Sequence, residues 1–407
     1  MISLEEAKNL LIQSVSPLEA VRIPLLLSIN HILNEDIKAD LPIPPYDISL
    51  MDGYAVRFED IKDATNTSKK KLSVVEIISA GSFPTKTIKK GESAKIMTGG
   101  YIPDGADTII KKEDSDNGDK IVTIFKPSKK GEYILKMGSE IKAGDIILSK
   151  GCWLGPGEIG LAATQGRSYL EVIRKPNVVI FSTGSELREI DDIYSSLKIV
   201  NSNCYSLGAQ IKLDGGNPHI LGIAIDRINM IKKKIYDALW ADMIISTGGT
   251  SKGDFDFILK AIKSIEGKII FSEVAIRPGK HTIFSIINGK PFLGLSGNPS
   301  ASLISYYIFG RPILMRLAGY KDCFLPVIKA KIPNPIKQKK DFIRIIRCQV
   351  IYGENEFIVT RYGKDIRFLE YVNGLLLIEK GEKILPRGSF VKLLLLPNFS
   401  QRIGLSP

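Results

Sequence analysis

The sequence predicts a multidomain α/β protein in which a doubly wound α/β domain lies between two segments rich in β-strands. The chain has 407 residues, which is more than one compact hydrophobic core usually contains. Patterns typical of strands and of helices alternate from Lys175 to about residue 317, whereas residues 72–148 and 323–407 carry short apolar runs separated by turn residues. We therefore expect several domains.

The N-terminal residues are expected to form a helical domain. Ser3 and Glu6 make a capping box that predicts a helix over residues 3–15, with an apolar face that includes Ala7 and Leu11. A second amphipathic stretch covers residues 17–32. Another helix is expected over residues 156–164, so the β-rich segment between these helices is interpreted as an insertion into a helical domain.

A proline-stiffened segment over residues 41–55 leads into the first β-rich segment. Its prolines favour an extended backbone, and Asp52-Gly53 is a turn signal directly before a strand at residues 54–57. Such a segment could be a simple linker with a turn, or it could fix the Asp52 carboxylate in a cleft. The spacing alone favours neither interpretation.

Both β-rich segments show strand-length runs bounded by turn residues. In the first, Thr98-Gly99-Gly100 follows a strand in the same way as Thr247-Gly248-Gly249 does later. The second is expected to form a small barrel-like domain. The expected strands are residues 72–80, 93–97, 108–111, 120–125 and 145–148 in the first segment, and 327–332, 342–352, 356–360, 375–379 and 390–396 in the second.

The doubly wound domain should bind ligands at one edge of its sheet. Strands are expected at residues 178–182, 220–224, 243–246, 268–274, 282–287 and 291–295, and helices at 201–213, 228–240, 255–264 and from Asn298 to about Leu317. In such sheets ligands bind beyond the carboxyl ends of the strands. The segments expected at this edge are residues 183–186, Asp226, 248–256, 277–280 and 297–299. None of them is a dinucleotide-binding or P-loop motif.

The loop over residues 248–256 has the composition of an anion and metal site. Glycines let backbone amides approach phosphate oxygens, hydroxyl groups add donors, and aspartates supply the hard oxygen ligands that suit Mg²⁺. The alternative is a tight strand-to-helix turn with Asp254 as the N-cap. The similar loops at Thr98 and at Gly297–Pro299 favour a ligand site. The candidate ligands in this loop are Gly248, Gly249, Thr250, Ser251, Asp254 and Asp256.

Two basic residues at the same edge could bind an oxyanion. Arg277 would do so through a bidentate fork and Lys280 as a point charge. The alternative is ordinary surface charge around a Pro-Gly turn. Glu186 could be either a metal or ligand contact or a carboxylate favoured by a helix N-terminus. His281 is interpreted as a bystander.

Composition and charge exclude several classes of protein. No apolar run could span a membrane, and the first residues lack the pattern of a secretory signal. The four cysteines form no CxxC pair, which argues against structural zinc and disulfides and fits the reducing cytoplasm. The net charge of +12 comes from short, scattered basic clusters, so we rank a lysine-rich composition first, anionic substrates second and nucleic acid last.

Several motifs together resemble one family over essentially the whole chain. They closely resemble the MoeA family of molybdopterin molybdenumtransferases, which includes the C-terminal domain of gephyrin. The motifs, in chain order, are Asp47-Ile-Ser-Leu-Met-Asp-Gly-Tyr-Ala55, Ile96-Met-Thr-Gly-Gly100, Phe181-Ser-Thr-Gly-Ser-Glu-Leu187, Ser246-Thr-Gly-Gly-Thr-Ser-Lys-Gly-Asp-Phe-Asp256, Arg277-Pro-Gly-Lys280 and Gly297-Asn-Pro299.

The resemblance implies four domains and an elongated homodimer, with an active site near the α/β domain that the second subunit completes. The implied domains are an N-terminal helical domain over residues 1–54 and 141–174, an inserted β domain over 55–140, a MogA-like α/β pterin-binding domain over 175–322 and a C-terminal β domain over 323–407. The implied reaction inserts molybdenum from molybdate into adenylylated molybdopterin and releases AMP with Mg²⁺. Other molybdenum-cofactor biosynthesis proteins could be partners.

The resemblance also implies roles for individual residues. The catalytic residues would be Asp52, Thr98, Glu186 and Asp256, and the metal ligands would be Asp52, Glu186, Asp226 and Asp256. The pterin phosphate region would lie on Gly248–Ser251, and Arg277, Lys280 and the Asn298-Pro299 loop would face molybdate. The residues expected to bind the cofactor are Ser182, Thr183, Gly184, Gly248, Gly249, Thr250, Ser251, Arg277, Lys280, Gly297, Asn298, Pro299 and Arg344.

The chain departs from the family pattern mostly on the oxyanion side. The family usually has Lys at Arg277 and Pro at both His281 and Ser296. These departures bear on the choice between molybdate and tungstate. Further departures are Ser139-Glu140, Ser300-Ala301 and Lys364-Asp365. The alternative to an enzyme is a pterin-binding or scaffold paralogue without turnover, although the sequence contains no separate partner-binding segment or linker.

Overall fold

The structure is a computed structural model that describes residues 1–192, 198–248, 255–338, 341–353, 355–363, 367–381 and 383–397, without the side chains of residues 255, 256 and 383. The chain divides into two compact units. The first, the core unit, contains Met1–Asn34, Trp153–Gly155 and Leu170–Pro407. The second, the β unit, contains Glu35–Cys152 and Pro156–Tyr169. No helix in the described part of the chain is both long enough and apolar enough to cross a membrane.

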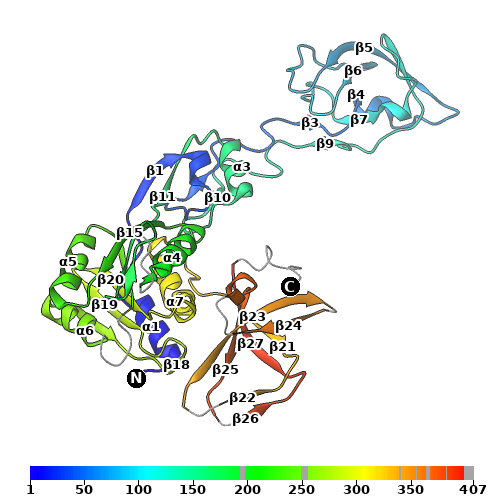
Figure 1. Cartoon of the computed structure of the whole chain (residues 1–407). Helices are drawn as coiled ribbons and strands as arrows, with labels where there is room; N and C mark the ends of the chain where they lie inside the picture. The colour runs from blue at the N-terminus through cyan, green and yellow to red at the C-terminus, as the bar shows by residue number, and fades with distance from the viewer. Residues whose placement is uncertain are drawn as a thin grey trace. The chain divides into compact units, whose positions relative to one another are not determined.

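A six-stranded sheet forms the centre of the core unit (Figure 1). Its spatial order is β15-β12-β16-β20-β19-β17, in which the first four strands are parallel and each of the last two pairs antiparallel with its neighbour. The strands are β12 (Asn177–Thr183), β15 (Asn217–Ala224), β16 (Met243–Thr247), β17 (Lys268–Phe271), β19 (Ile283–Ile287) and β20 (Lys290–Leu295).

Helices cover both faces of this sheet, which confirms the doubly wound prediction. On one face, Phe181 and Ile244 pack in a fully buried cluster with Ile235 of α5 (Ile228–Ala238) and with α6 (Phe255–Ser264). On the other face, Ile180 packs in a second cluster with side chains of several helices. These helices are α1 (Leu4–Ser14), α4 (Ser202–Leu213), α7 (Pro299–Ser305), the π-helical turn Tyr306–Gly310 and α8 (Arg311–Leu317).

The N-terminal helix is confirmed, but the stretch after it does not form a helix. The Ser3 hydroxyl accepts a hydrogen bond from the Glu6 N–H, 3.1 Å, and this bond caps α1. Residues 17–32 instead contain β1 (Ala20–Pro24), which pairs with β11 (Tyr169–Ile173), and a 3₁₀ turn at Leu25–Ser28. Pro24 lacks an N–H and disfavours helical geometry in the residue before it, so the apolar periodicity alone was misleading.

The C-terminal residues form the expected barrel, and it is closed. Five strands pair in the order β23-β24-β21-β27-β25, and β25 pairs back to β23. A short strand from the α/β region, β18 (Ile276–Arg277), joins parallel to β23 and places Arg277 opposite Arg344. The strands are β21 (Val327–Lys331), β23 (Ile343–Gly353), β24 (Glu356–Tyr362), β25 (Gly374–Ile378) and β27 (Phe390–Leu395), with a separate pair β22 (Ile336–Gln338) and β26 (Lys383–Leu385).

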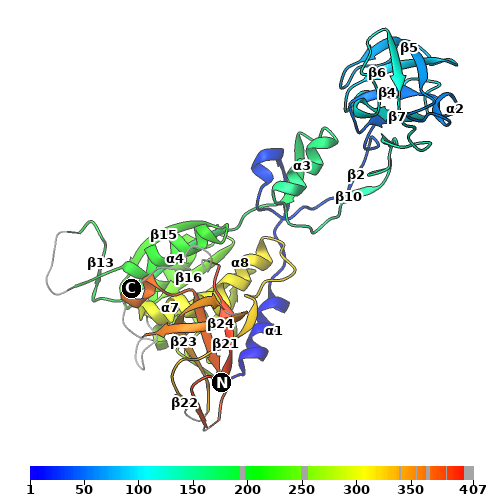
Figure 2. The ribbon, with the colours of Figure 1, turned by 90° about the vertical axis from the view of Figure 1, so that its right-hand side faces the viewer.

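The β unit contains the strands that were predicted for the first β-rich segment (Figure 2). Its five-stranded sheet has the order β7-β4-β6-β5-β8, and α3 (Pro156–Thr164) forms at the predicted residues. The strands of the sheet are β4 (Gly53–Val56), β5 (Lys70–Ile78), β6 (Glu92–Ile96), β7 (Thr108–Lys111) and β8 (Ile121–Ile124), and two short pairs are β2 (Ile37–Lys38) with β10 (Ile146–Leu148) and β3 (Ile48–Ser49) with β9 (Ile134–Leu135).

A partly buried ion pair fastens the amino ends of the central strands. Arg174 donates two hydrogen bonds, 2.6 and 2.7 Å, to the carboxylate of Asp242, whose side chain is 3% exposed. The same carboxylate accepts the N–H of Asn177, the first residue of β12, and Arg174 also donates to Glu19. Burial opposes ionisation of Asp242, but the hydrogen bonds from Arg174 and Asn177 outweigh it and lower the pKa of this carboxyl group.

Replacing Asp242 by Asn should therefore lower the free energy of unfolding by about 3 kcal/mol, because the Arg174 guanidinium would lose its buried partner. Denaturant unfolding measures this loss, and the control Asp237→Asn, at an exposed position, should change the free energy of unfolding by less than about 0.5 kcal/mol.

Since the folded-state pKa of Asp242 lies below its ordinary value of 3.8, the stabilisation by this ion pair should be present above about pH 4 and disappear as the pH falls through the folded-state pKa. Equal free energies of unfolding for Asp242→Asn and the parent protein at pH 7 would contradict this account.

Candidate functional site

Three parallel strands of the core unit end side by side and open into a cavity. Ser182 of β12 is in register with Thr247 of β16, and Thr247 is in register with Leu295 of β20. The cavity beyond these ends, which we call the strand-end cavity, has a volume of about 500 Å³. It is lined by Ser182, Thr183, Glu186, Leu187, Ile199, Val200, Asn201, Ser202, Asn203, Thr247, Gly248, Ser296, Gly297, Asn298 and Pro299.

Two glycines allow the loops after these strands to touch. Gly248 has a φ of +94°, and a Cβ atom on it would lie 2.1 Å from the carbonyl oxygen of Thr183. A Cβ atom on Gly297 would lie 3.2 Å from the Cα atom of Gly248. A side chain at Gly248 would both strain the backbone and collide with β12, so the floor of the cavity requires glycine there.

Polar side chains line the strand-end cavity in a fixed arrangement. The hydroxyl groups of Ser182 and Thr247 lie 2.8 Å apart, and Ser182 also donates to Oδ1 of Asn201. Asn203 of α4 donates through Nδ2 to the carbonyl oxygen of Gly297, 2.8 Å, and this bond connects α4 to the loop after β20. Thr183 is 1% exposed, and its hydroxyl has no hydrogen-bond partner among the described residues. A buried hydroxyl of this kind is a candidate contact for a bound ligand.

Carboxylates lie at the loop that follows β12. Glu186 is exposed and lines the cavity, and Asp226 accepts a hydrogen bond from the N–H of Ser185, 3.1 Å. Mg²⁺ is usually held by one or two carboxylates together with water and substrate phosphates, so this donor set fits that metal. The described residues contain no group of three or more His, Cys, Asp or Glu side chains placed to hold a metal. Asp256 is the second residue of α6, and its side chain lies outside the described residues.

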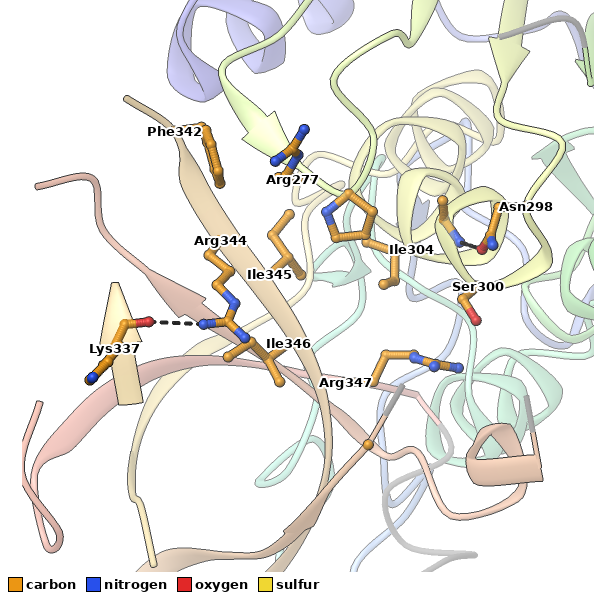
Figure 3. Close-up of a pocket in the computed structure, with 13 residues that line it drawn as sticks. Arg277, Asn298, Ser300, Ile304, Lys337, Phe342, Arg344, Ile345, Ile346 and Arg347 are labelled. Carbon is orange, nitrogen blue, oxygen red and sulfur yellow. Dashed lines mark hydrogen bonds between the residues drawn. The ribbon is translucent and has the colours of Figure 1, made fainter. Parts of the chain in front are cut away.

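A second cavity of about 570 Å³ lies between the barrel and α7, and we call it the basic cavity (Figure 3). Arg277 of β18 and Arg344 of β23 are register partners at its wall. The guanidinium of Arg277 lies 5.1 Å from the ring centre of Phe342, and Arg344 donates to the carbonyl oxygen of Lys337, 2.9 Å. The lining residues are Arg277, Pro278, Asn298, Ser300, Ala301, Ile304, Lys337, Phe342, Arg344, Ile345, Ile346, Arg347 and Gly363.

The two cavities differ in charge and share one residue. Glu186 lines the strand-end cavity, whereas the described residues that line the basic cavity include lysine and arginine but no aspartate or glutamate. Asn298 lines both. Its Oδ1 accepts the N–H of Ala301, 3.1 Å, and so caps α7. This bond uses the amide oxygen, so the NH₂ group is the donor that Asn298 can offer to a ligand.

Lys280 and His281 do not line either cavity. The Lys280 ammonium lies 3.6 Å from Oε1 of Glu273, and Nδ1 of His281 lies 3.2 Å from the same oxygen. Asn203 and Arg347, by contrast, line the cavities although the sequence analysis did not single them out. Arg347 interrupts the apolar run over residues 342–352, and that interruption was the available signal.

The β unit brings Asp52 and Thr98 together. The backbone N–H and the hydroxyl group of Thr98 both donate to Oδ1 of Asp52, at 2.8 and 2.9 Å. Lys112 lies 3.9 Å from Oδ2. The two hydrogen bonds from Thr98, helped by Lys112, lower the pKa of Asp52, so this carboxylate is ionised at neutral pH.

Some predicted residues cannot be placed in this way. Gly249, Thr250, Ser251 and Asp254 lie outside the described residues, as does Lys364. The structure gathers part of the predicted set, Ser182, Thr183, Glu186, Gly248, Gly297, Asn298 and Pro299, around the strand-end cavity, and places Arg277, Asn298 and Arg344 at the basic cavity.

Comparisons with known proteins identify the family. Residues 2–166 match the model of the MoeA N-terminal region (domain I and II), and residues 179–316 match that of a probable molybdopterin binding domain. Molybdopterin molybdenumtransferase of Staphylococcus epidermidis is 35% identical over 402 residues, which cover 97% of this chain and 95% of that protein. The Staphylococcus aureus protein of the same name is 33% identical over 349 residues, which cover 86% and 83%.

A solved structure supports the same assignment over almost the full length. The crystal structure of a molybdopterin biosynthesis MoeA protein from Pyrococcus horikosii matches with a TM-score of 0.84 and 28% identity, covering 97% of this chain and 99% of that chain. The fold, the two family models and the full-length relatives agree, and the chain belongs to the MoeA family of molybdopterin molybdenumtransferases.

Proposed function

We propose that this protein inserts molybdenum from molybdate into adenylylated molybdopterin and releases AMP in a Mg²⁺-dependent reaction. The observation that carries this proposal is the pair of adjoining cavities that share Asn298. One is polar and borders on carboxylates, and the other is lined by cations. A phosphorylated substrate with its metal and a tetrahedral oxyanion could therefore lie next to each other.

The strand-end cavity is assigned to the pterin and its phosphate groups. Gly248 and Gly297 let the loops after β12, β16 and β20 pack together as the floor of this cavity, and Ser182 and Thr183 line it. Gly249, Thr250 and Ser251 would extend this surface. Ligands of parallel α/β sheets bind at this edge of the sheet, which supports the assignment independently of the residue types.

Glu186, Asp226 and Asp256 are assigned to Mg²⁺. Bound there, the metal would neutralise charge on the pyrophosphate of the adenylylated substrate. The protein side chains hold the carboxylate oxygens in position: the hydrogen bond between Asp226 and the Ser185 N–H fixes the loop that carries Glu186. Pyrophosphate cleavage depends mainly on positioning and charge neutralisation, which fits a site that has no obvious nucleophile.

The basic cavity is assigned to molybdate. Arg277 and Arg344 stand on neighbouring strands, and guanidinium groups bind oxyanions through paired N–H donors. With no carboxylate among its described lining residues, the cavity favours anions over cations. Lys280 is a weaker candidate than the sequence analysis implied, because its ammonium lies near Glu273.

The Asp52–Thr98 pair is assigned to the same reaction, contributed by a second copy of the chain in a homodimer. Its support is the resemblance to the family together with the ionised state of Asp52. We also keep as proposals the division into four domains with the boundaries given above and a cytoplasmic location.

Replacing Asp52 by Asn should reduce molybdate-dependent AMP release from adenylylated molybdopterin by about 100-fold or more, because the active site would lose an ionised carboxylate. Single-turnover assays with molybdate and Mg²⁺ measure this rate. The matched control is Asp119→Asn, which removes an exposed carboxylate paired with Lys95 in the same unit and should change the rate by less than about twofold. Should the parent protein release no AMP, the non-catalytic pterin-binding alternative would replace this proposal.

Replacing Glu186 by Gln should raise the Mg²⁺ concentration needed for half-maximal AMP release at least about tenfold, since a carboxylate ligand becomes a neutral amide. The measurement is a Mg²⁺ titration of the initial rate. Glu5→Gln, which removes an exposed carboxylate of α1 that lines neither cavity, should leave the titration unchanged. Coincident titrations for Glu186→Gln and the parent would remove Glu186 from the metal site.

A further inference from the structure

Arg347 is a deeply buried arginine at the basic cavity. It lies on β23, its side chain is part of the cavity lining, and the residue is only 5% exposed. Figure 3 shows the side chain extending from β23 toward the α7 side of the cavity, where Ser300 lies. Its position was not expected from the sequence motifs, which pointed to Arg277, Lys280 and Arg344.

The two arginines of β23 approach the cavity from different sides of the strand. Successive side chains of a strand point to opposite faces, so residues three apart, such as Arg344 and Arg347, point in opposite directions. All residues from Arg344 to Arg347 nevertheless line the cavity. Figure 3 shows the two side chains extending to different sides of β23. The two guanidinium groups therefore lie at different parts of the cavity, and that of Arg347 lies on the α7 side.

The surroundings strengthen the attraction of Arg347 for an anion. The described lining residues contribute four cationic side chains, Arg277, Lys337, Arg344 and Arg347, and no acidic ones. A charge in a buried environment is screened less by water than an exposed one, so it interacts more strongly with a charge in the cavity. Arg347 is the most buried of these four cations.

We propose that Arg347 binds the tetrahedral oxyanion directly, as a specificity-determining residue, in a cavity whose positive charge is increased by Arg277 and Arg344. This inference rests on the proposed function and deepens it: the basic cavity holds a doubly charged oxyanion of the molybdate and tungstate type against the Arg347 guanidinium, on the α7 side. Arg347 occupies the role that the sequence analysis gave to Lys280, whose ammonium is near Glu273 instead.

The test measures binding of tungstate to the full chain by calorimetry, without any pterin substrate. Arg347→Gln should weaken binding about tenfold or more, the loss typical of one charge-assisted interaction. Arg347→Lys should restore part of the affinity, since it keeps the charge but not the bidentate fork. The matched control is Arg361→Gln. Arg361 is an exposed arginine of the same barrel that stacks on Phe368 and Tyr371 and lines neither cavity. The Arg361→Gln variant should bind tungstate with the affinity of the parent protein.

Tungstate binding by Arg347→Gln at the parent's affinity would overturn the proposal, as would equal losses in Arg347→Gln and Arg361→Gln. Thermal unfolding of each variant separates loss of the fold from loss of the contact. If Arg347→Gln does not fold, Arg347→Lys provides the test. Weaker tungstate binding by a folded Arg347→Lys supports the proposal, and unchanged binding overturns it. Binding that depends on Arg347 in a protein that releases no AMP would keep this inference and discard the proposed reaction.

Discussion

The contact between the loops that follow β12, β16 and β20 is the constraint on which the site depends. Gly248 approaches the Thr183 carbonyl so closely that a Cβ atom would lie 2.1 Å from its oxygen, and Gly297 packs against Gly248 from the other side. This packing forms the floor of the strand-end cavity. It is possible because the strands end in register, with Ser182 beside Thr247 and Thr247 beside Leu295. Fully buried residues on both faces of the sheet hold this register.

The same arrangement separates charges of opposite sign. Carboxylates gather beyond β12 and β15: Glu186 is on the loop after β12, and Asp226, which follows β15, accepts a hydrogen bond from the Ser185 N–H of that loop. The arginines come from the barrel and from β18, which leaves the α/β region to pair with β23. Asn298 stands at the boundary, with its amide oriented by the cap of α7. A site that must accept both a metal-bound phosphate and a free oxyanion benefits from this separation, because the metal ligands do not repel the oxyanion.

The sequence predicted the features that depend on local pattern and missed those that depend on tertiary contacts. The Ser3–Glu6 cap, the buried strand at residues 243–246 and the β character of residues 323–407 were visible because capping residues, apolar runs and turn residues report on the backbone nearby. Residues 17–32 were misleading because Pro24 outweighed the amphipathic periodicity. The barrel's closure required a pairing between β25 and β23 that no local signal encodes.

For the candidate site, the motif loops carried most of the information. They pointed to the strand ends, where Thr183, Glu186 and Gly297 lie, but they could not show that Lys280 is near Glu273 or that Arg347 faces a cavity. Both facts depend on which way a long side chain extends, and the packing of neighbouring elements decides that. The motifs therefore pointed to residues that line the two cavities, but they did not show where the long cationic side chains lie.

The central claim is that one substrate occupies the strand-end cavity while its oxyanion partner occupies the basic cavity, with Asn298 between them. A crystal structure of the protein with adenylylated molybdopterin and tungstate tests it most directly, since anomalous scattering locates the tungsten atom. The account predicts phosphate groups beside Gly248 and Gly297 and tungsten in the basic cavity, beside the Arg347 guanidinium. Tungsten bound outside the basic cavity, or a pterin nucleotide that leaves the strand-end cavity empty, would contradict it.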